Sequence, residues 1–262
     1  MKPRIKYIPF VFLLSLALLC GCRAVPSEEA QSTEEAKGRI VYPEPDGRMV
    51  VMIDAGHGFR DIGCDTELLL GTEADVTLDM AKRLARDLEG KGVTVILTHD
   101  GESFPDCDEI KELAEGEGIE YDGEKLLEND IFSAYERAVY SSAVAKKENV
   151  DLFVSLHVNS IANNPSVSRF EIDYYRDNPY ASSLRVFSES LADSLSGETV
   201  IYADPLDKAF LVTKTGAHPS VLIEMGYATN ESDSANLNSD EWRKSFSEGL
   251  SQRIFEWIDT YE

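Results

Sequence analysis

The sequence is poor in several residue types, and each shortage excludes a class of protein. Its 262 residues include only four histidines and four cysteines, so neither a histidine-rich zinc scavenger nor a disulfide framework is indicated. Lys and Arg number 25 against 48 Asp and Glu, which gives a formal net charge of −23. Nucleic acids and anionic lipid surfaces attract basic proteins, so neither is expected as an electrostatic partner. No internal repeat is present.

Long apolar runs are also scarce, and the one at the N-terminus is residues 8–19. It follows the basic residues Lys2, Arg4 and Lys6, and it is too short for a comfortable membrane span. Residues 1–21 are therefore predicted to be a secretion signal. An uncleaved anchor helix is the alternative interpretation.

The run ends in Leu19-Cys20-Gly21-Cys22, which resembles the bacterial lipobox. That resemblance implies cleavage before Cys22, which would carry a diacylglycerol and hold the chain at the outer face of the bacterial cytoplasmic membrane. Cleavage before Cys20 is less favoured, because Leu19 would then occupy a position that normally holds a small residue.

Residues 22–47 contain Ser, Glu and Pro but few large apolar side chains, so they are predicted to form a flexible acidic tether behind the acylated cysteine. Residues 48–262 have the length of one domain. This domain retains Cys64 and Cys107. A bridge between them is possible in an extracellular compartment, but two cysteines form no framework, and two free thiols are favoured.

Within this domain, short apolar runs alternate with segments of helical periodicity. Buried strands are expected at residues 49–53, 93–97, 151–156 and 220–223, with a half-exposed strand at 170–175. Helices are expected around residues 76–88, 134–147, 184–195 and 242–257. This order predicts a single α/β domain with a twisted, largely parallel sheet and helices on both faces. Ligands should gather at the carboxyl ends of the strands.

Two of the four histidines lie just past predicted buried strands. His57 follows Ile53-Asp54-Ala55-Gly56, and His157 follows residues 154–156. Strand ends from distant parts of the chain converge in a parallel sheet, and neutral imidazole is a common zinc ligand. A hydrogen-bonded structural role for each histidine remains the alternative.

Two glutamates complete the candidate site. Glu73 opens the first predicted helix, where the helix dipole alone also favours an acidic residue. Glu224 directly follows a buried strand, where a carboxylate is costly without a partner. Beside a metal, such a carboxylate can serve as a general base.

These residues belong to motifs that together resemble the zinc-dependent N-acetylmuramoyl-L-alanine amidases. The matching segments, in order, are residues 53–58, 73–78, 95–98, 135–137, 155–160 and 221–230. The resemblance implies that His57, Glu73 and His157 bind Zn²⁺ and that Glu224 is the catalytic carboxylate. The implied reaction is hydrolysis of the amide between N-acetylmuramic acid and L-alanine in peptidoglycan. A protein activator is compatible with the sequence, but no residue identifies one.

Asn159 and Arg137 lie inside matching segments, and either could position substrate, support the site or be purely structural. Glu67 competes with Glu73 as the third ligand, but Leu78 follows Glu73 at the family's interval, which favours Glu73.

One cysteine and the two remaining histidines have competing interpretations. Cys64 could also bind metal, whereas a buried or bridged cysteine is favoured. His99 and Glu102 form a His-x-x-Glu spacing used by zinc carboxypeptidases, which we interpret as coincidence, and His218 is expected to be a structural loop residue.

The acidic segment between Thr98 and Tyr135 is long for a connection, and it could be a lid or an inert surface excursion. Two other functions compete with the amidase: a zinc peptidase that cuts within the peptidoglycan stem peptide, and a non-catalytic cell-wall-binding lipoprotein of the same fold. The second is disfavoured because all four expected polar positions are filled.

Overall fold

A sheet of six strands forms the centre of the domain. The computed structural model describes residues 48–126, 132–204, 210–214 and 218–261, so the predicted signal, Cys22 and the tether lie outside it. The strands are β1 (Val50–Ala55), β2 (Thr94–Leu97), β3 (Leu152–Asn159), β4 (Phe170–Tyr175), β5 (Thr199–Asp204) and β6 (Ser220–Tyr227). The near-continuous apolar sequences of β1, β3 and β6 suit strands that are covered on both faces.

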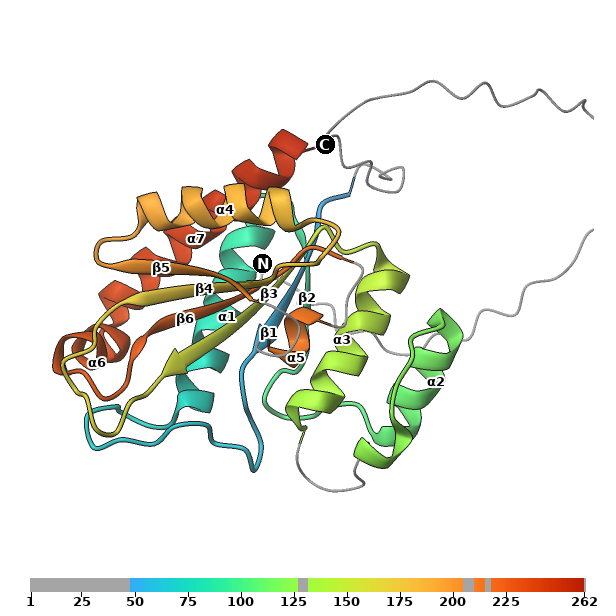
Figure 1. Cartoon of the computed structure of the whole chain (residues 1–262), viewed down its shortest axis with the longest axis horizontal. Helices are drawn as coiled ribbons and strands as arrows, with labels where there is room; N and C mark the ends of the chain where they lie inside the picture. Colours follow the sequence, from blue (N-terminus) through green and yellow to red (C-terminus); the bar gives the residue numbers. More distant parts are fainter. Residues whose placement is uncertain (1–47, 127–131, 205–209, 215–217, 262) are drawn as a thin grey trace, which may run out of the picture. The chain divides into compact units, whose positions relative to one another are not determined.

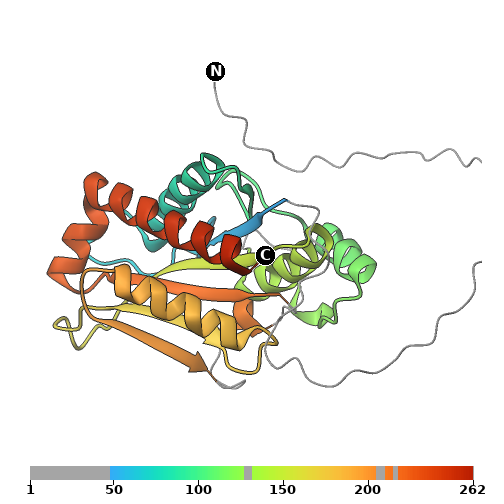
Figure 2. The ribbon, with the colours of Figure 1, turned by 90° about the horizontal axis from the view of Figure 1, so that it is seen from above.

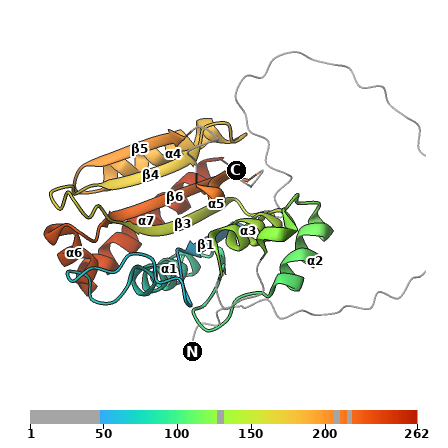
Figure 3. The ribbon, with the colours of Figure 1, turned by 60° about the horizontal axis from the view of Figure 1, so that its bottom comes forward.

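The strand order across the sheet is β2-β1-β3-β6-β4-β5. Figure 3 shows this order from β5 at one edge through β4, β6 and β3 to β1. Strands β2, β1, β3 and β6 run parallel to one another, whereas β4 pairs antiparallel with β6 and parallel with β5. The predicted α/β class with a largely parallel sheet is confirmed.

Helices cover both faces of the sheet, as expected (Figures 1 and 2). They are α1 (Glu73–Glu89), α2 (Cys107–Glu117), α3 (Ala134–Glu148), α4 (Ala181–Ser194), α5 (Leu211–Lys214), α6 (Glu231–Asn238) and α7 (Asp240–Tyr261). The apolar stripes of α1, α4 and α7 pack on one face, and those of α3 and α5 pack on the other. Within the described ranges, no helix is long and apolar enough to cross a membrane.

Side-chain alternation makes one face of the sheet polar near the carboxyl ends of its central strands. Ile53 and Val154 face α1 and belong to the larger apolar cluster. Their successors Asp54 and Ser155, and Glu224 on β6, point to the α3 side, because successive side chains in a strand alternate between faces. All of these positions are buried. Polar groups from three strands therefore gather on one face.

Four elements were not expected from the sequence: α2, α5, α6 and β5. Helix α2 buries only Cys107, Ile110 and Ala114, so its apolar stripe is narrow and its periodicity weak. Its capping box, in which Asp106 and Glu109 bind each other's backbone amides, is the stronger local signal. Strand β5 holds a short apolar run, Val200-Ile201-Tyr202-Ala203, but it is only partly buried at the sheet edge.

His218 precedes β6 in the interior, in agreement with the structural role expected for it. Its side chain is buried, and its ring lies 5.9 Å from that of Phe153. Burial lowers its pKa to about 4, because the charged imidazolium loses its hydration.

This depressed pKa makes the stability of the protein depend on pH. Between pH ~6.5 and ~4, His218 is protonated in the unfolded chain but stays neutral in the folded chain. The free energy of unfolding therefore falls as the pH falls, by about 3 kcal/mol over the whole window. His218→Leu should remove this share of the acid sensitivity in urea unfolding measured from pH 4.5 to 8. Above pH 7 the two stability curves should run parallel, and equal slopes below pH 6.5 would contradict the assignment.

Candidate active site

The His57 loop leaves β1 in contact with the end of β3. The Gly56 amide donates to the carbonyl of Leu156 (3.0 Å), which joins the loop to β3. A Cβ atom at Gly56 would lie 2.5 Å from the His157 ring, so glycine is required where this ring passes the backbone. The His57 and His157 rings consequently lie edge to face with centroids 4.9 Å apart.

Glu73 is the first residue of α1, and the helix start fixes its position. Thr72 and Asp75 form a capping box that begins the helix. The carboxylate of Glu73 then accepts hydrogen bonds from two backbone amides, Val158 (2.9 Å) and Cys64 (2.8 Å). A carboxylate held from two sides in this way has a defined orientation.

The three side chains expected to bind metal converge. Oε1 of Glu73 lies 3.2 Å from Nε2 of His57 and 3.1 Å from Nδ1 of His157. One donor atom from each residue lies within 4.8 Å of the others, and this is the group with metal-binding spacing among the described residues. Two imidazoles and one carboxylate are a donor set of catalytic zinc sites, so these residues fit zinc.

The protonation states of Glu73 and His157 suit a metal, whereas a metal at His57 would have to compete with a proton. Burial, opposed by the contact with Glu73, lowers the pKa of His157, so its ring is neutral at physiological pH. Burial acts to raise the pKa of Glu73, but hydrogen bonds from His157 and His57 outweigh it and lower the pKa well below the usual range. For His57, contacts with Glu73 and Asp61 outweigh burial and raise the pKa. Metal binding requires the anionic carboxylate and neutral imidazoles.

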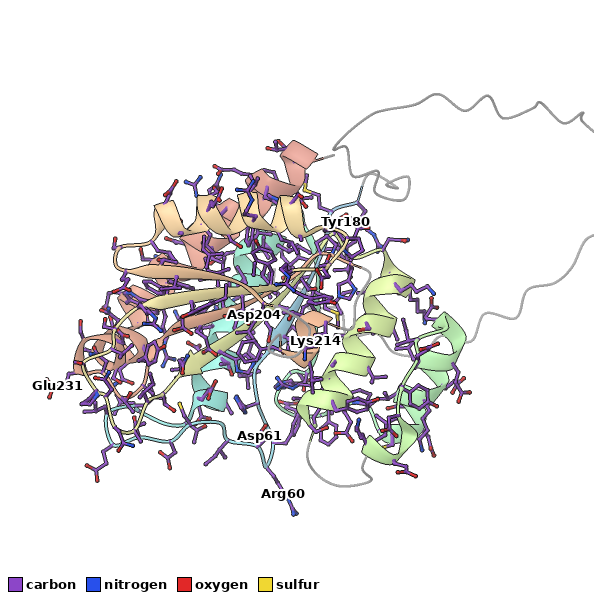
Figure 4. The ribbon with its side chains drawn as sticks, viewed as in Figure 1. Arg60, Asp61, Tyr180, Asp204, Lys214 and Glu231 are labelled. Atoms are coloured by element: carbon purple, nitrogen blue, oxygen red, sulfur yellow. The ribbon has the colours of Figure 1, made fainter. Side chains whose placement is uncertain are left out.

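Asp61 belongs to the site but was not found in the sequence. Its Oδ1 lies 2.9 Å from Nδ1 of His57, although the approach is not aligned as a hydrogen bond. A carboxylate beside the second nitrogen of a metal-binding histidine orients the ring. Figure 4 labels Asp61 beside Arg60, on the same loop. The sequence signal that could have identified Asp61 is its position four residues after His57, in a loop bounded by glycines.

Glu224 lies inside β6, in its carboxyl half and beside β3, because the strand continues past the predicted end at residue 223. It pairs with His157 in the parallel register. Its side chain is 7% exposed and its Oε2 has no hydrogen-bond partner. Burial raises the pKa of Glu224 well above its usual value, and the nearby carboxylates of Glu73, Asp173 and Glu171 raise it further. The group therefore keeps its proton to a higher pH than an ordinary glutamate.

Glu171 on β4 was also missed, and it contacts Asn159. It lies opposite Glu224 in the antiparallel pair of β4 and β6. Its carboxylate accepts from Asn159 Nδ2 (3.1 Å), Arg169 Nε (2.7 Å) and the Tyr227 hydroxyl. Asn159 therefore turns toward Glu171, beside the candidate catalytic carboxylate.

The expectation that β4 is half exposed is wrong. Five of its six residues are buried, including Glu171 and Asp173. Burial, with the neighbouring carboxylates of Asp204 and Glu171, raises the pKa of Asp173 to about 8. Figure 4 labels Asp204 near the middle of the domain. The alternation that suggested an exposed polar face instead places acidic side chains in the interior next to the site.

Arg137 lies beneath the site. Its Nη1 donates to Oδ2 of Asp54 (3.2 Å) and to the carbonyl of Ala55 (3.2 Å). Asp54 also accepts from the hydroxyls of Thr98 and Ser155. Arg137 is 2% exposed, so these contacts support the end of β1, which matches the supporting role considered for it.

The competing acidic and histidine ligands lie apart from the cluster. Glu67 is exposed and is not part of the metal-spaced group. His99 is buried with Nε2 2.9 Å from the Ala55 carbonyl, whereas Glu102 is exposed. The His-x-x-Glu spacing therefore does not form a metal site.

Cys64 and Cys107 do not form a disulfide with each other in the described part of the chain. Cys64 donates from Sγ to the Val158 carbonyl (3.6 Å). Burial, together with the Glu73 carboxylate, raises the pKa of Cys64 to about 12, and Cys64 is not part of the metal-spaced group. Cys107 is buried in the contact between α2 and α3.

Known proteins share this sequence pattern and this fold. Residues 51–256 match the family model for N-acetylmuramoyl-L-alanine amidase. The amidase AmiA of Escherichia coli is 24% identical over 94% of this chain and 90% of its own length. LytC of Bacillus subtilis is 27% identical over 76% of this chain, which spans 34% of LytC. The solved structure of AmiC2 from Nostoc punctiforme, 29% identical, has a TM-score of 0.57 and covers 82% of this chain and 99% of its own.

The chain belongs to the N-acetylmuramoyl-L-alanine amidase family, because the family model matches most of its length. The expectation that it is an enzyme of this amidase class is thereby confirmed.

Arg137→Met should destabilise the fold, because it leaves the Asp54 carboxylate buried without its cation. We expect the free energy of unfolding to fall by about 3–5 kcal/mol in urea titrations. Arg185→Met is the matched control, since Arg185 pairs with Glu189 on an exposed helix face and should contribute less than about 1 kcal/mol. A variant at Arg137 that kept full stability but raised KM would instead indicate contact with substrate.

Proposed function

We propose that the protein is a zinc-dependent hydrolase that cleaves the amide between the lactyl group of N-acetylmuramic acid and L-alanine of the peptidoglycan stem peptide. The observation that carries the proposal is the position of Glu73, whose carboxylate lies between the rings of His57 and His157. Glu224 on β6 lies beside His157 on β3. Membership of the amidase family supports the choice of substrate.

His57, Glu73 and His157 would hold the metal. Zinc, when bound, supplies Lewis acidity: it acidifies a water molecule and polarises an amide carbonyl. The protein's part is to keep Glu73 anionic and His157 neutral. Contacts with His157 and His57 lower the pKa of Glu73 against the effect of burial, two backbone amides hold its carboxylate, and burial lowers the pKa of His157.

Glu224 would move the proton. Its Oε2 is buried without a partner, so it is free to accept a proton from water and to return it to the departing alanine nitrogen. The raised pKa of Glu224 strengthens the carboxylate as a base. Asn159 and Glu171, linked by a hydrogen bond beside Glu224, would shape the adjoining surface for substrate.

The main test uses the full-length chain purified in detergent and incubated with peptidoglycan, with mass spectrometry of the products. We expect stem peptides that begin with free L-alanine. Zinc chelation should abolish their release, and Glu224→Gln should slow it by about 10²–10⁴-fold because proton transfer is lost.

Glu67→Gln is the matched control, because this glutamate lies in the same loop region as Glu73 but is exposed and outside the metal-spaced group. It should leave the rate unchanged. Products cut within the stem peptide would show that the protein is a zinc peptidase and not an amidase. Binding to peptidoglycan with zinc present but without any product would favour a non-catalytic cell-wall-binding lipoprotein.

We further propose that the enzyme works at the outer face of the bacterial cytoplasmic membrane, held by a lipid on Cys22. The support is the motif Leu19-Cys20-Gly21-Cys22 behind a short apolar run. A formal net charge of −23 provides no electrostatic attraction to anionic lipid, so the acyl chains would supply the attachment.

Labelled fatty acid should be incorporated into the chain in a bacterial host that processes lipoproteins, and the label should disappear in Cys22→Ser. Cys20→Ser should keep the label, since this residue leaves with the signal. Loss of label in Cys20→Ser alone would move the modification to Cys20, and an unlabelled, membrane-bound wild type would favour an uncleaved anchor helix.

A further inference from the structure

The backbone that presents His57 is strained. His57 and Phe59 have φ values of 66° and 58°, and Gly58 between them has a φ of 124°. A residue other than glycine in the left-handed region is strained and persists only where its surroundings enforce the conformation. The backbone bonds between Gly58 and Asp61, 2.7 and 3.0 Å long, close the loop but do not attach it to the rest of the domain.

Beyond the bond from the Gly56 amide to the Leu156 carbonyl at its start, the loop is attached through the ring of Phe59. Its centroid lies 4.4 Å from that of Phe104 and 5.2 Å from that of His99. Phe104 in turn stacks on Phe132 at 5.2 Å with an interplanar angle of 14°. Tilted and stacked aromatic pairs of this kind stabilise a structure beyond the area they bury. These contacts therefore favour the conformation in which the loop is strained.

His99 supports the same loop from below. Its Nε2 lies 2.9 Å from the carbonyl of Ala55, before the loop. A Cβ atom on Gly58 would lie 2.9 Å from the His99 ring, so the loop backbone rests directly on the imidazole. The ring therefore contacts the chain on both sides of His57.

These supports belong to the long segment after β2, and helix α2 makes that segment rigid. Cys107, Ile110 and Ala114 of α2 pack with Phe132 and Val139 in one apolar cluster, and Phe59 and Phe104 pack against it. Figures 1 and 2 show α2 beyond α3, on the side away from the sheet. In the described part of the segment, α2 thus supports the His57 loop through Phe104.

We propose that Phe104 is a positioning residue for the metal ligand His57, and that the segment from His99 to Leu126 serves as a brace for the metal site. The inference rests on the proposed zinc site but not on the identity of the substrate. Without the Phe104 ring, Phe59 loses its closest aromatic contact, and the strained backbone at His57 relaxes away from Glu73 and His157.

The test measures zinc binding directly. Zinc affinity of the metal-free, full-length chain is determined by competition with a chromophoric chelator for the wild type, Phe104→Ala, Phe104→Leu and Tyr121→Ala. Loss of a residue that orients a metal ligand typically lowers affinity by about 10–100-fold, and we expect at least ~10-fold for Phe104→Ala with partial recovery in Phe104→Leu. The d–d absorption of the cobalt-substituted protein should shift in Phe104→Ala.

Tyr121→Ala is the matched control, because Tyr121 packs against the same apolar cluster and donates to Glu115 but has no ring contact with Phe59. Its zinc affinity and cobalt spectrum should match the wild type. Equal zinc affinity in Phe104→Ala and the wild type, or equal losses in Phe104→Ala and Tyr121→Ala, would overturn the proposal. If Phe104→Ala does not fold, the zinc affinities of Phe104→Leu and Tyr121→Leu are compared instead. Equal affinities in these two variants would overturn the proposal. If the zinc affinities follow this order but the wild type shows no amidase activity, the proposed substrate is wrong and the role of Phe104 stands.

Discussion

The structure around the site depends on one buried charge, the carboxylate of Asp54. It is fully buried at the end of β1 and is held by contacts from β2, β3 and α3, made by Thr98, Ser155 and Arg137. An unpaired charge in this position would cost several kcal/mol, so the fold is stable only when all four elements meet there. Arg137 also reaches the carbonyl of Ala55, which fixes the backbone where β1 turns into the His57 loop.

From that fixed point, the site combines carboxyl groups in opposite electrostatic environments. Glu73 accepts two backbone amides and touches two imidazoles, which lowers its pKa and suits a metal ligand. Glu224 has an unpartnered oxygen among the carboxylates of Glu171 and Asp173, which raises its pKa and suits proton transfer. Two residues of the same type are thus given different capacities by their surroundings, as acid and base chemistry in one site requires.

Much of this was predictable from the sequence, because it is encoded locally. The apolar runs that became β1, β3 and β6 and the four-residue spacing in α1 predicted the sheet and its helices. His57, His157 and Glu224 were found because each follows a short apolar run in the sequence, and parallel strands place ligands near their carboxyl ends. His157 and Glu224 in fact lie inside β3 and β6, which extend past those runs. Helix α2 could not be predicted in this way, because its apolar stripe is too narrow to produce a clear periodicity.

The sequence by itself determined the class of fold, the family motifs and the side chains that the sheet brings together, since periodicity and strand ends are properties of neighbouring residues. Only the tertiary structure decided how these side chains are used. Arg137 and Asp54 are 83 positions apart, and nothing local shows that they meet in the interior. The same holds for Glu171 beside Glu224 and for Phe104 against Phe59, because their contacts and pKa values depend on burial and on long-range approach.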